Sequence, residues 1–420
     1  MGRKIRIMHM SDVHVGTYIG KLMPVPYAAL SMHQSLFDVF KALDIAIDNA
    51  VQDQVDFILI TGDLFHRPIN SRVILATLAR RIRRLTEIAP VIILAGNHDI
   101  VSNTHMLSDV AELSVNNLHI VSDPTVLNLE TKDGIKVCFV CAGWPMKTMI
   151  SNIEGVQGLD SAKASSTQVL QAMLNDFAEE AAEKAPADAV KVFAGHGTMQ
   201  NVYSGADIDR LGGSQFSASI AREDIVFYPA KFTGYDYVAL GHIHLRACRP
   251  EMRVCYPGSI YPVNFSEWDI PHGYILAEID SDTRELELIE RDIFIRPYSN
   301  LVLKTSRFKS EDEILAHILE NAPADPERFV RVYFVVDKDG LDINPVAIQD
   351  NLDGHYGFLK IDKTYQTDGE LAPQDDVVWQ TGDTVISLVK RYLENKPEIP
   401  PDKKTKIIIR LRTLINASTD

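Results

Sequence analysis

Apolar runs of strand length alternate with helix-period segments through the first half of the chain, and this alternation constrains the fold most. Strands are predicted at residues 5–10, 55–60, 91–95, 136–141, 190–194 and 237–240, and helices at 36–51, 72–88 and 168–184. Strands that alternate with helices form sheets whose faces the helices cover. Short β segments follow at 246–248, 254–256, 274–279 and 285–289. The sequence therefore predicts one α/β domain over residues 1–296.

A different pattern begins at Pro297. A strand is predicted at 301–305, a helix at 311–319 and a strand at 329–336, which indicates a small α+β domain over residues 297–361. The Gly-, Asp- and Gln-rich stretch 362–376 is typical of a linker, and helices are predicted at 384–394 and 404–415. Residues 362–420 are thus interpreted as a linker followed by C-terminal helices.

Composition narrows the class of protein. Of the 420 residues 46% are hydrophobic and 24% charged, which is typical of a globular chain. No apolar stretch is long enough for a membrane span, and the N-terminus lacks a secretory signal, so we expect a cytoplasmic protein. A net charge of −15 argues against bulk binding of nucleic acid. The charge is unevenly distributed, however: residues 64–86 hold six arginines and no acid, and residues 403–412 hold five basic residues.

Polar side chains follow five of the predicted strands. The candidate ligands are Asp12, His14, Asp63, Asn97, His196, His242 and His244. Ligand sites in open α/β sheets form at the carboxyl ends of strands, so we expect these side chains to share one crevice. Each motif alone is common by chance, and each histidine alone would be taken as structural. Five motifs in order, each at a strand end, favour a site.

The set of donors predicts the chemistry. Seven donors are too many for one four-coordinate zinc ion and suit two divalent ions about 3.5–4 Å apart, with Asp63 as the candidate bridge. Nitrogen and oxygen donors without thiolate favour manganese or iron. His98 follows a candidate ligand and is the candidate general acid for a leaving oxygen. These residues predict phosphoester hydrolysis.

The same residues resemble the calcineurin-like metallophosphoesterases and, within them, the SbcD and Mre-eleven DNA-repair nucleases. The resemblance covers roughly Ile5 to Glu267, and its most nuclease-like segments are 62–66, 235–244 and 256–259. It implies a β-sandwich flanked by helices, with a small α+β capping domain at 297–361 and an ATPase-binding segment within 362–420. It also implies one metal on Asp12, His14, Asp63 and His244 and another on Asp63, Asn97, His196 and His242, with His98 catalytic and His66 positioning the phosphate.

Members of that nuclease family are manganese-dependent exo- and endonucleases of DNA repair and recombination, and they form homodimers with an SbcC-type coiled-coil ATPase. The resemblance thus implies DNA and that ATPase as partners, and Mn²⁺ as the metal, with Fe²⁺ or Mg²⁺ as alternatives. Two other hypotheses remain: a phosphatase or small-molecule phosphodiesterase, and a DNA-end-binding scaffold that does not cut. The intact ligand set argues against the scaffold.

The remaining arginines, cysteines, tryptophans and one histidine are weighed between functional and structural roles. The six arginines are either phosphate contacts or the solvated face of a helix, and Arg67 is the best candidate for a DNA contact. Cys138 and Cys141 are expected on opposite faces of a strand. A two-residue turn after Arg249 would leave Cys248 opposite Arg253, out of register for a disulfide with Cys255. Trp144, Trp268 and His272 are interpreted as structural.

Overall fold

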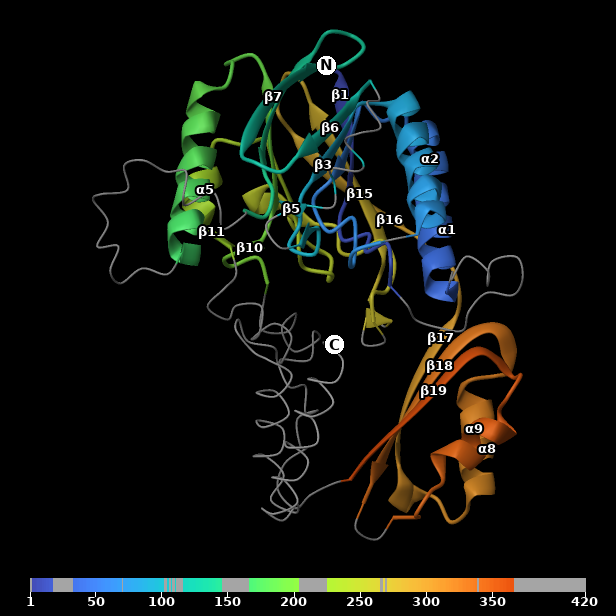
Figure 1. The fold of residues 1–420 in the computed structure, drawn as a ribbon. Coiled ribbons are helices and arrows are strands. Elements are labelled where there is room, and N and C mark those ends of the chain that lie inside the picture. Colours follow the sequence, from blue (N-terminus) through green and yellow to red (C-terminus); the bar gives the residue numbers. More distant parts are fainter. Residues whose placement is uncertain are drawn as a thin grey trace, which may run out of the picture. The chain divides into compact units, whose positions relative to one another are not determined.

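The structure is a computed structural model of the chain. It describes residues 2–17, 33–69, 71–101, 104–105, 107, 110, 116–145, 166–203, 225–264, 267–268, 270–337 and 340–365. The chain divides into two compact units, residues 1–301, 318–331 and 349–360 in the first and residues 302–317, 332–348 and 361–420 in the second. Figure 1 shows the elements of both units.

The first unit contains two six-stranded mixed sheets. The first sheet has the order β16-β15-β1-β2-β3-β6. Its strands are β1 (Lys4–Met10), β2 (Phe57–Ile60), β3 (Val91–Leu94), β6 (Leu118–Val121), β15 (Gly273–Asp280) and β16 (Leu286–Asp292). Strands β1, β2, β3 and β6 are parallel, so their carboxyl ends lie along one edge. Strand β15 pairs antiparallel with β1 and with β16.

The second sheet has the order β13-β14-β12-β9-β8-β7. Its strands are β7 (Thr125–Glu130), β8 (Lys136–Ala142), β9 (Val190–His196), β12 (Tyr237–Gly241), β13 (Ala247–Arg249) and β14 (Val254–Tyr256). Strands β8, β9, β12 and β14 are parallel. Short pairs β4 (Ile100–Val101) with β5 (Thr104–His105) and β10 (Thr198–Met199) with β11 (Val226–Phe227) complete the β structure of this unit up to Asp292.

Helices cover the outer faces of the two sheets. Helices α1 (Gln34–Gln52) and α2 (Arg72–Ile88) lie against the first sheet, and α5 (Ser166–Lys184) lies against the second, on the opposite side of the unit (Figure 1). Strand alternation sends Ile5 and Ile7 of β1 into the core between the sheets, while Met8 and Met10 pack under the helices. Hydrophobic residues at helical spacing, such as Leu36, bury the inner face of α1.

The second half of the chain holds a three-stranded sheet of order β17-β18-β19. It consists of β17 (Tyr298–Lys304), β18 (Asp325–Val336) and β19 (Tyr356–Tyr365), with helices α8 (Glu311–Asn321) and α9 (Pro345–Asn351). Three 3-10 turns, Pro229–Phe232, Pro250–Met252 and Thr305–Arg307, join other elements.

The predicted strands and helices up to residue 336 are present, with ends that shift by a few residues. The predicted linker was wrong at its start, because β19 extends to Tyr365. Strands β6, β7 and β19 and helix α9 were missed. The predicted helices at 384–394 and 404–415 and the basic run 403–412 lie outside the described residues. None of the described helices is long and apolar enough to cross a membrane.

The prediction for Cys248 and Cys255 was wrong. Four residues separate the paired Arg249 and Val254, because a 3-10 turn at Pro250–Met252 is followed by Arg253 in the left-handed region (φ 57°). The two additional residues bring Cys248 opposite Cys255, and the two form a disulfide. By contrast, Cys138 faces the core under α5 and Cys141 faces the core between the sheets, as the strand period predicted.

Candidate metal centre

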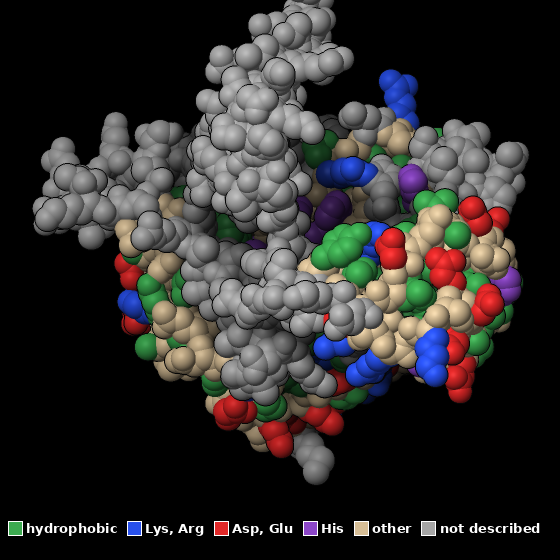
Figure 2. Space-filling view, turned by 90° about the horizontal axis from the view of Figure 1, so that it is seen from below, with side chains coloured by type: hydrophobic (Ala, Val, Ile, Leu, Met, Phe, Trp, Pro, Cys, Tyr) green, Lys and Arg blue, Asp and Glu red, His purple; other side chains and the backbone are tan. Residues whose placement is uncertain are grey.

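The predicted donors come together at the carboxyl ends of five strands. Loops after β1, β2 and β3 carry Asp12, His14, Asp63 and Asn97, while the end of β9 and the loop after β12 carry His196, His242 and His244. Because the strands within each set are parallel, all five loops lie at the same end of the two sheets. Figure 2, which looks onto that end, shows histidine side chains within a depression of the surface.

One side of the cluster is formed by Asp12, His14 and His244. The Nε2 atoms of the two histidines are 3.0 Å apart. Asp12 Oδ1 lies 3.8 Å from Nε2 of His244 and 4.0 Å from Nε2 of His14. The other carboxylate oxygen, Oδ2, accepts hydrogen bonds from Ser11 Oγ at 2.5 Å and from the backbone N–H of His242 at 3.1 Å. Asp12 is therefore held with Oδ1 facing both imidazoles.

The other side is formed by Asn97, His196 and His242. Asn97 Oδ1 is 3.0 Å from Nε2 of His196 and 3.0 Å from Nδ1 of His242. Asp63 joins the two sides, because its Oδ2 lies 3.6 Å from Nε2 of His14 and 3.6 Å from Nε2 of His196. Its second oxygen, Oδ1, accepts a hydrogen bond of 2.8 Å from the backbone N–H of His98.

The backbone at the cluster is strained. Asp12, His14 and Asp63 have φ values of 51°, 49° and 51°, and His242 has a φ of 102°. Non-glycine residues seldom adopt this left-handed region, and such residues concentrate at functional sites. Two glycines permit the close approach: a Cβ on Gly96 would collide with Asp63, and one on Gly62 with the His196 ring.

Electrostatics favour charged carboxylates at the centre. Burial opposes ionisation of Asp63, but the neighbouring charge of His196 lowers the pKa of Asp63 below its usual 3.8. Burial lowers the pKa of His14 well below 6.5, which keeps its imidazole neutral. Asp12 Oδ1 is buried and accepts no hydrogen bond from any described residue. A buried carboxylate oxygen beside imidazole nitrogens and an amide oxygen fits divalent cations of the first transition row.

Comparison with known families identifies the site. Residues 5–246, more than half of the chain, match the model of the calcineurin-like phosphoesterases. The chain belongs to this family. The phosphoesterase is therefore a metal-dependent hydrolase, and its cluster suggests two divalent metal ions.

Solved structures resemble the phosphoesterase only distantly. A dimetal phosphatase from Danio rerio is 11% identical, with a TM-score of 0.33, and the match covers 68% of this chain and 98% of that chain. A glutamine-dependent NAD⁺ synthetase from Acinetobacter baumannii, in complex with ADP, is 8% identical, with a TM-score of 0.30, and the match covers 99% of this chain and 72% of that chain. The family assignment depends on the match over residues 5–246 alone.

His66 and His98 of the phosphoesterase lie beside the cluster. Nδ1 of His66 is 3.2 Å from Nδ1 of His14, and Nδ1 of His98 is 3.0 Å from the backbone oxygen of His66. Burial and the neighbouring His98 lower the pKa of His66 to about 4. The two rings stack with an interplanar angle of 15°, and His98 is exposed. His98 can therefore meet a ligand from solvent while its backbone is fixed by Asp63.

Sequence reasoning missed three groups that support the cluster. The buried Asp99 accepts hydrogen bonds from the backbone N–H groups of Leu64, Phe65 and Gly96, and so fixes the two loops that carry Asp63 and Asn97. The Glu267 carboxylate accepts from Nδ1 of His244 at 2.8 Å. Neither acid stands at a strand end in a recognisable metal motif, although Asp99 adjoins the Gly96-Asn97-His98 motif.

Trp144 is the third missed group. It was interpreted as a core anchor, but its ring is half-buried beside the cluster, 5.3 Å from the His242 ring and 6.1 Å from the His196 ring. Its backbone N–H donates to the oxygen of Ala95, just before the Asn97 loop. Trp268, by contrast, packs on Tyr298 and Phe329, as a structural residue would.

The structure separates Arg67 from three of the other arginines of residues 64–86, which form ion pairs on the helical surface. Arg81 and Arg84 pair with Asp44 of α1, and Arg83 pairs with Glu87, so these three belong to the helical surface. Arg67 is exposed beside the cluster, and its Nε donates to the oxygen of Gly16 at 3.2 Å.

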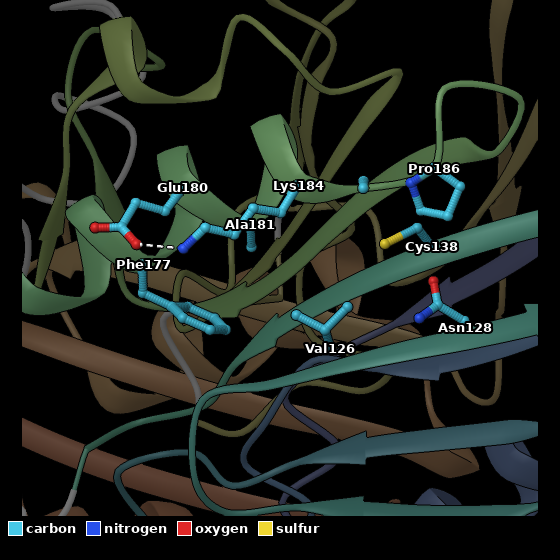
Figure 3. A pocket seen from close by; sticks show the side chains of 9 residues that line it. Val126, Asn128, Cys138, Phe177, Glu180, Ala181, Lys184 and Pro186 are labelled. Atoms are coloured by element: carbon cyan, nitrogen blue, oxygen red, sulfur yellow. Dashed lines mark hydrogen bonds and ion pairs between the residues drawn. The ribbon is translucent and has the colours of Figure 1, made fainter.

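A cavity lies apart from the cluster, between α5 and strands β7 and β8 (Figure 3). Its volume is about 180 Å³, and its lining is mainly apolar, with Val126, Phe177 and the Cys138 thiol facing inward. An ion pair of 2.8 Å between Lys184 and Glu180 borders it. This cavity shares no residue with the metal cluster.

Proposed function

We propose that this phosphoesterase is a two-cation DNA nuclease subunit. It hydrolyses phosphodiester bonds as an exo- and endonuclease in DNA end processing and double-strand-break repair, with Mn²⁺ as the preferred metal. Support comes from the family match together with the nuclease-like segments 62–66 and 235–244, which carry Asp63, His66, His242 and His244.

The ligand assignment follows from the two sides of the cluster. One cation would be held by Asp12, His14, Asp63 and His244, and the other by Asp63, Asn97, His196 and His242. The observation that carries the proposal is the position of Asp63 Oδ2, which is 3.6 Å from a histidine nitrogen on each side. A carboxylate placed in this way can bridge two cations.

Two cations bound in this way supply a hydroxide nucleophile at neutral pH and neutralise the phosphate oxygens. The side chains beside them handle the remaining tasks. The backbone oxygen of His66 can only accept, so Nδ1 of His98 carries a hydrogen. To act as the general acid, the ring must carry a second proton on Nε2, which the imidazolium gives to the leaving oxygen. His66 positions the phosphate, and the exposed Arg67 is proposed to contact the DNA backbone.

The other parts of the chain complete the proposal. Residues 297–361, which include β17, β18 and the first part of β19, serve as a capping domain that helps to grip DNA. Residues 362–420 bind an SbcC-type coiled-coil ATPase, and the protein acts as a homodimer in the cytoplasm, on the nucleoid if the source is bacterial. These assignments extend the sequence resemblance and depend on the nuclease activity itself.

The decisive experiment measures cutting of linear double- and single-stranded DNA with Mn²⁺, Mg²⁺ or chelator, beside p-nitrophenyl diester and monoester substrates. Manganese-dependent DNA cutting that is lost in chelator and in Asp63→Ala is the expected result. Monoester turnover with intact DNA would contradict the proposal and favour a phosphatase. DNA-end binding without hydrolysis of any substrate would favour a scaffold.

A further inference from the structure

We propose that Glu267 is a positioning residue that makes the Asp12–His14–His244 side the tighter of the two cation sites. The proposal rests on the two-cation assignment above but not on the identity of the substrate. Its starting point is that the two sides of the cluster, although similar in ligand number, differ in the groups behind their histidines.

Glu267 is a buried carboxylate, 4% exposed, that lies directly behind His244. It accepts hydrogen bonds from His244 Nδ1 at 2.8 Å, from the backbone N–H of Val263 at 2.8 Å and from Asn264 Nδ2 at 2.5 Å. Three donors fix the carboxylate, and it in turn holds the hydrogen on Nδ1 of His244. Nε2 of His244 is then directed at Asp12 Oδ1 and His14 Nε2.

The segment that carries Glu267 is itself tied to the sheets. The ring of His272 lies between Ser259 and Glu267, with Nδ1 3.0 Å from Ser259 Oγ and Nε2 2.8 Å from the backbone oxygen of Glu267. Ser259 forms a β-bridge with Ser11, next to Asp12. The Glu267 carboxylate is thus held in a fixed position relative to the loop that carries Asp12 and His14. His272 therefore helps to position Glu267 in addition to packing.

The opposite side differs in the group behind His196. Nδ1 of His196 donates to the backbone oxygen of Thr61 at 2.8 Å, which is a neutral acceptor. Its oxygen ligand, Asn97, is a neutral amide. The first side therefore has two charged ligands, Asp12 and the shared Asp63, with the Glu267 carboxylate hydrogen-bonded to its His244, whereas the shared Asp63 is the one carboxylate ligand of the second side. A divalent cation is held more tightly where more negative charge faces it, so the first side loads first.

The test is a Mn²⁺ titration of the metal-free full-length protein, in which free Mn²⁺ is followed by electron paramagnetic resonance. Wild type is expected to show two binding events of unequal affinity. Glu267→Gln keeps the size, removes the charge and is expected to raise the lower dissociation constant about 10- to 100-fold, with little change in the higher one. Asn97→Ala removes a ligand of the second side and is expected to raise only the higher dissociation constant.

Glu278→Gln is the matched control, because Glu278 is also a buried carboxylate, 7% exposed, but pairs with Lys4 and Arg6 away from the cluster. It should leave both constants unchanged. If Glu267→Gln fails to fold by circular dichroism, Asn264→Ala, which removes one donor to the carboxylate, should raise the same constant about 2- to 10-fold.

An unchanged lower constant in the folded Glu267 variant, or an equal loss at both sites, would overturn the inference. These results are distinguishable from failure of the proposed function. Two unequal Mn²⁺ sites that respond to Glu267 in a protein that leaves DNA intact would reject the nuclease and keep the inference. A single Mn²⁺ site in wild type would reject the two-cation assignment itself.

Discussion

The two sheets contribute to the metal cluster in different ways. Strand ends of the first sheet supply Asp12, His14, Asp63 and Asn97, which include every oxygen donor, whereas the second sheet supplies only histidines. In the first sheet Asp12, His14 and Asp63 lie in strained left-handed turns, while His196 of the second sheet is still part of regular strand β9. The carboxylate ligands are thus concentrated in one sheet and the other sheet supplies nitrogen donors, while left-handed backbone occurs in both, at His242 (φ 102°) in the second.

This difference means that neither sheet alone carries a complete metal site. Hydrogen bonds across the sandwich, such as His242 N–H to Asp12 and His196 Nδ1 to the Thr61 oxygen, set one group of ligands against the other. The core between the sheets, which includes Phe57, Phe139 and Tyr237, fixes their spacing. The predictions below ask which sheet each step depends on, from the largest expected effect to the smallest.

Asp63→Ala should remove the link between the two sides. We expect hydrolysis of DNA and of the p-nitrophenyl diester to fall by about 10³-fold or more, because groups that act as one unit fail together. Initial rates at saturating Mn²⁺ measure this. Asp48→Ala, an exposed change on α1, is the control. Diester turnover within tenfold of wild type would mean that Asp63 does not bridge.

His98→Ala separates proton transfer from binding within the first sheet. DNA cutting should fall about 10²- to 10⁴-fold, the usual contribution of a general acid, with Mn²⁺ and DNA affinities unchanged. The p-nitrophenyl diester should lose much less activity, because its leaving group departs without a proton. Equal losses on both substrates would contradict the proton-donor assignment.

Trp144→Ala tests the second sheet. Its ring packs 5.3 Å from the His242 ring, and loss of an aromatic contact of this kind costs about 0.5–1.5 kcal/mol. We expect the weaker Mn²⁺ site to lose about 2- to 10-fold in affinity, with the tighter site unaffected, in the same titration used for Glu267. Trp144→Phe should retain most of the affinity. A loss at the tighter site instead would show that Trp144 acts through His244 rather than His242.

Low pH should weaken the ion pair between Asp53 and Arg291 at the first sheet. Although burial opposes it, Arg291 holds the pKa of Asp53 below its usual 3.8. A lowered folded-state pKa gives stability that is present above pH 3.8 and is lost as pH falls through the lowered value. Because the Arg291 side chain is 34% exposed, we expect less than about 1 kcal/mol. Thermal melting of wild type and Arg291→Gln between pH 7 and pH 3 should converge at the acid end, and a constant difference would contradict this.

Local sequence patterns were sufficient to predict most helices and strands and the set of candidate metal ligands. Apolar runs such as Val91–Leu94 can satisfy their backbone and bury their side chains only as interior strands, so period and length predicted them. Strand β19 was missed at residues 362–365 because its polar, weakly buried residues carry little pattern. The disulfide was missed because its register depends on the length of the turn after Arg249.

The sequence alone determined that Asp, His and Asn side chains stand at the ends of five strands, since chain direction and the two-residue period act locally. It could not determine which atoms face each other. Only the packing of the two sheets placed Glu267 behind His244, Trp144 beside His242 and Asp63 between the two sides. These partners are separated by 23 residues or more in the chain, and such contacts depend on the whole core rather than on local spacing.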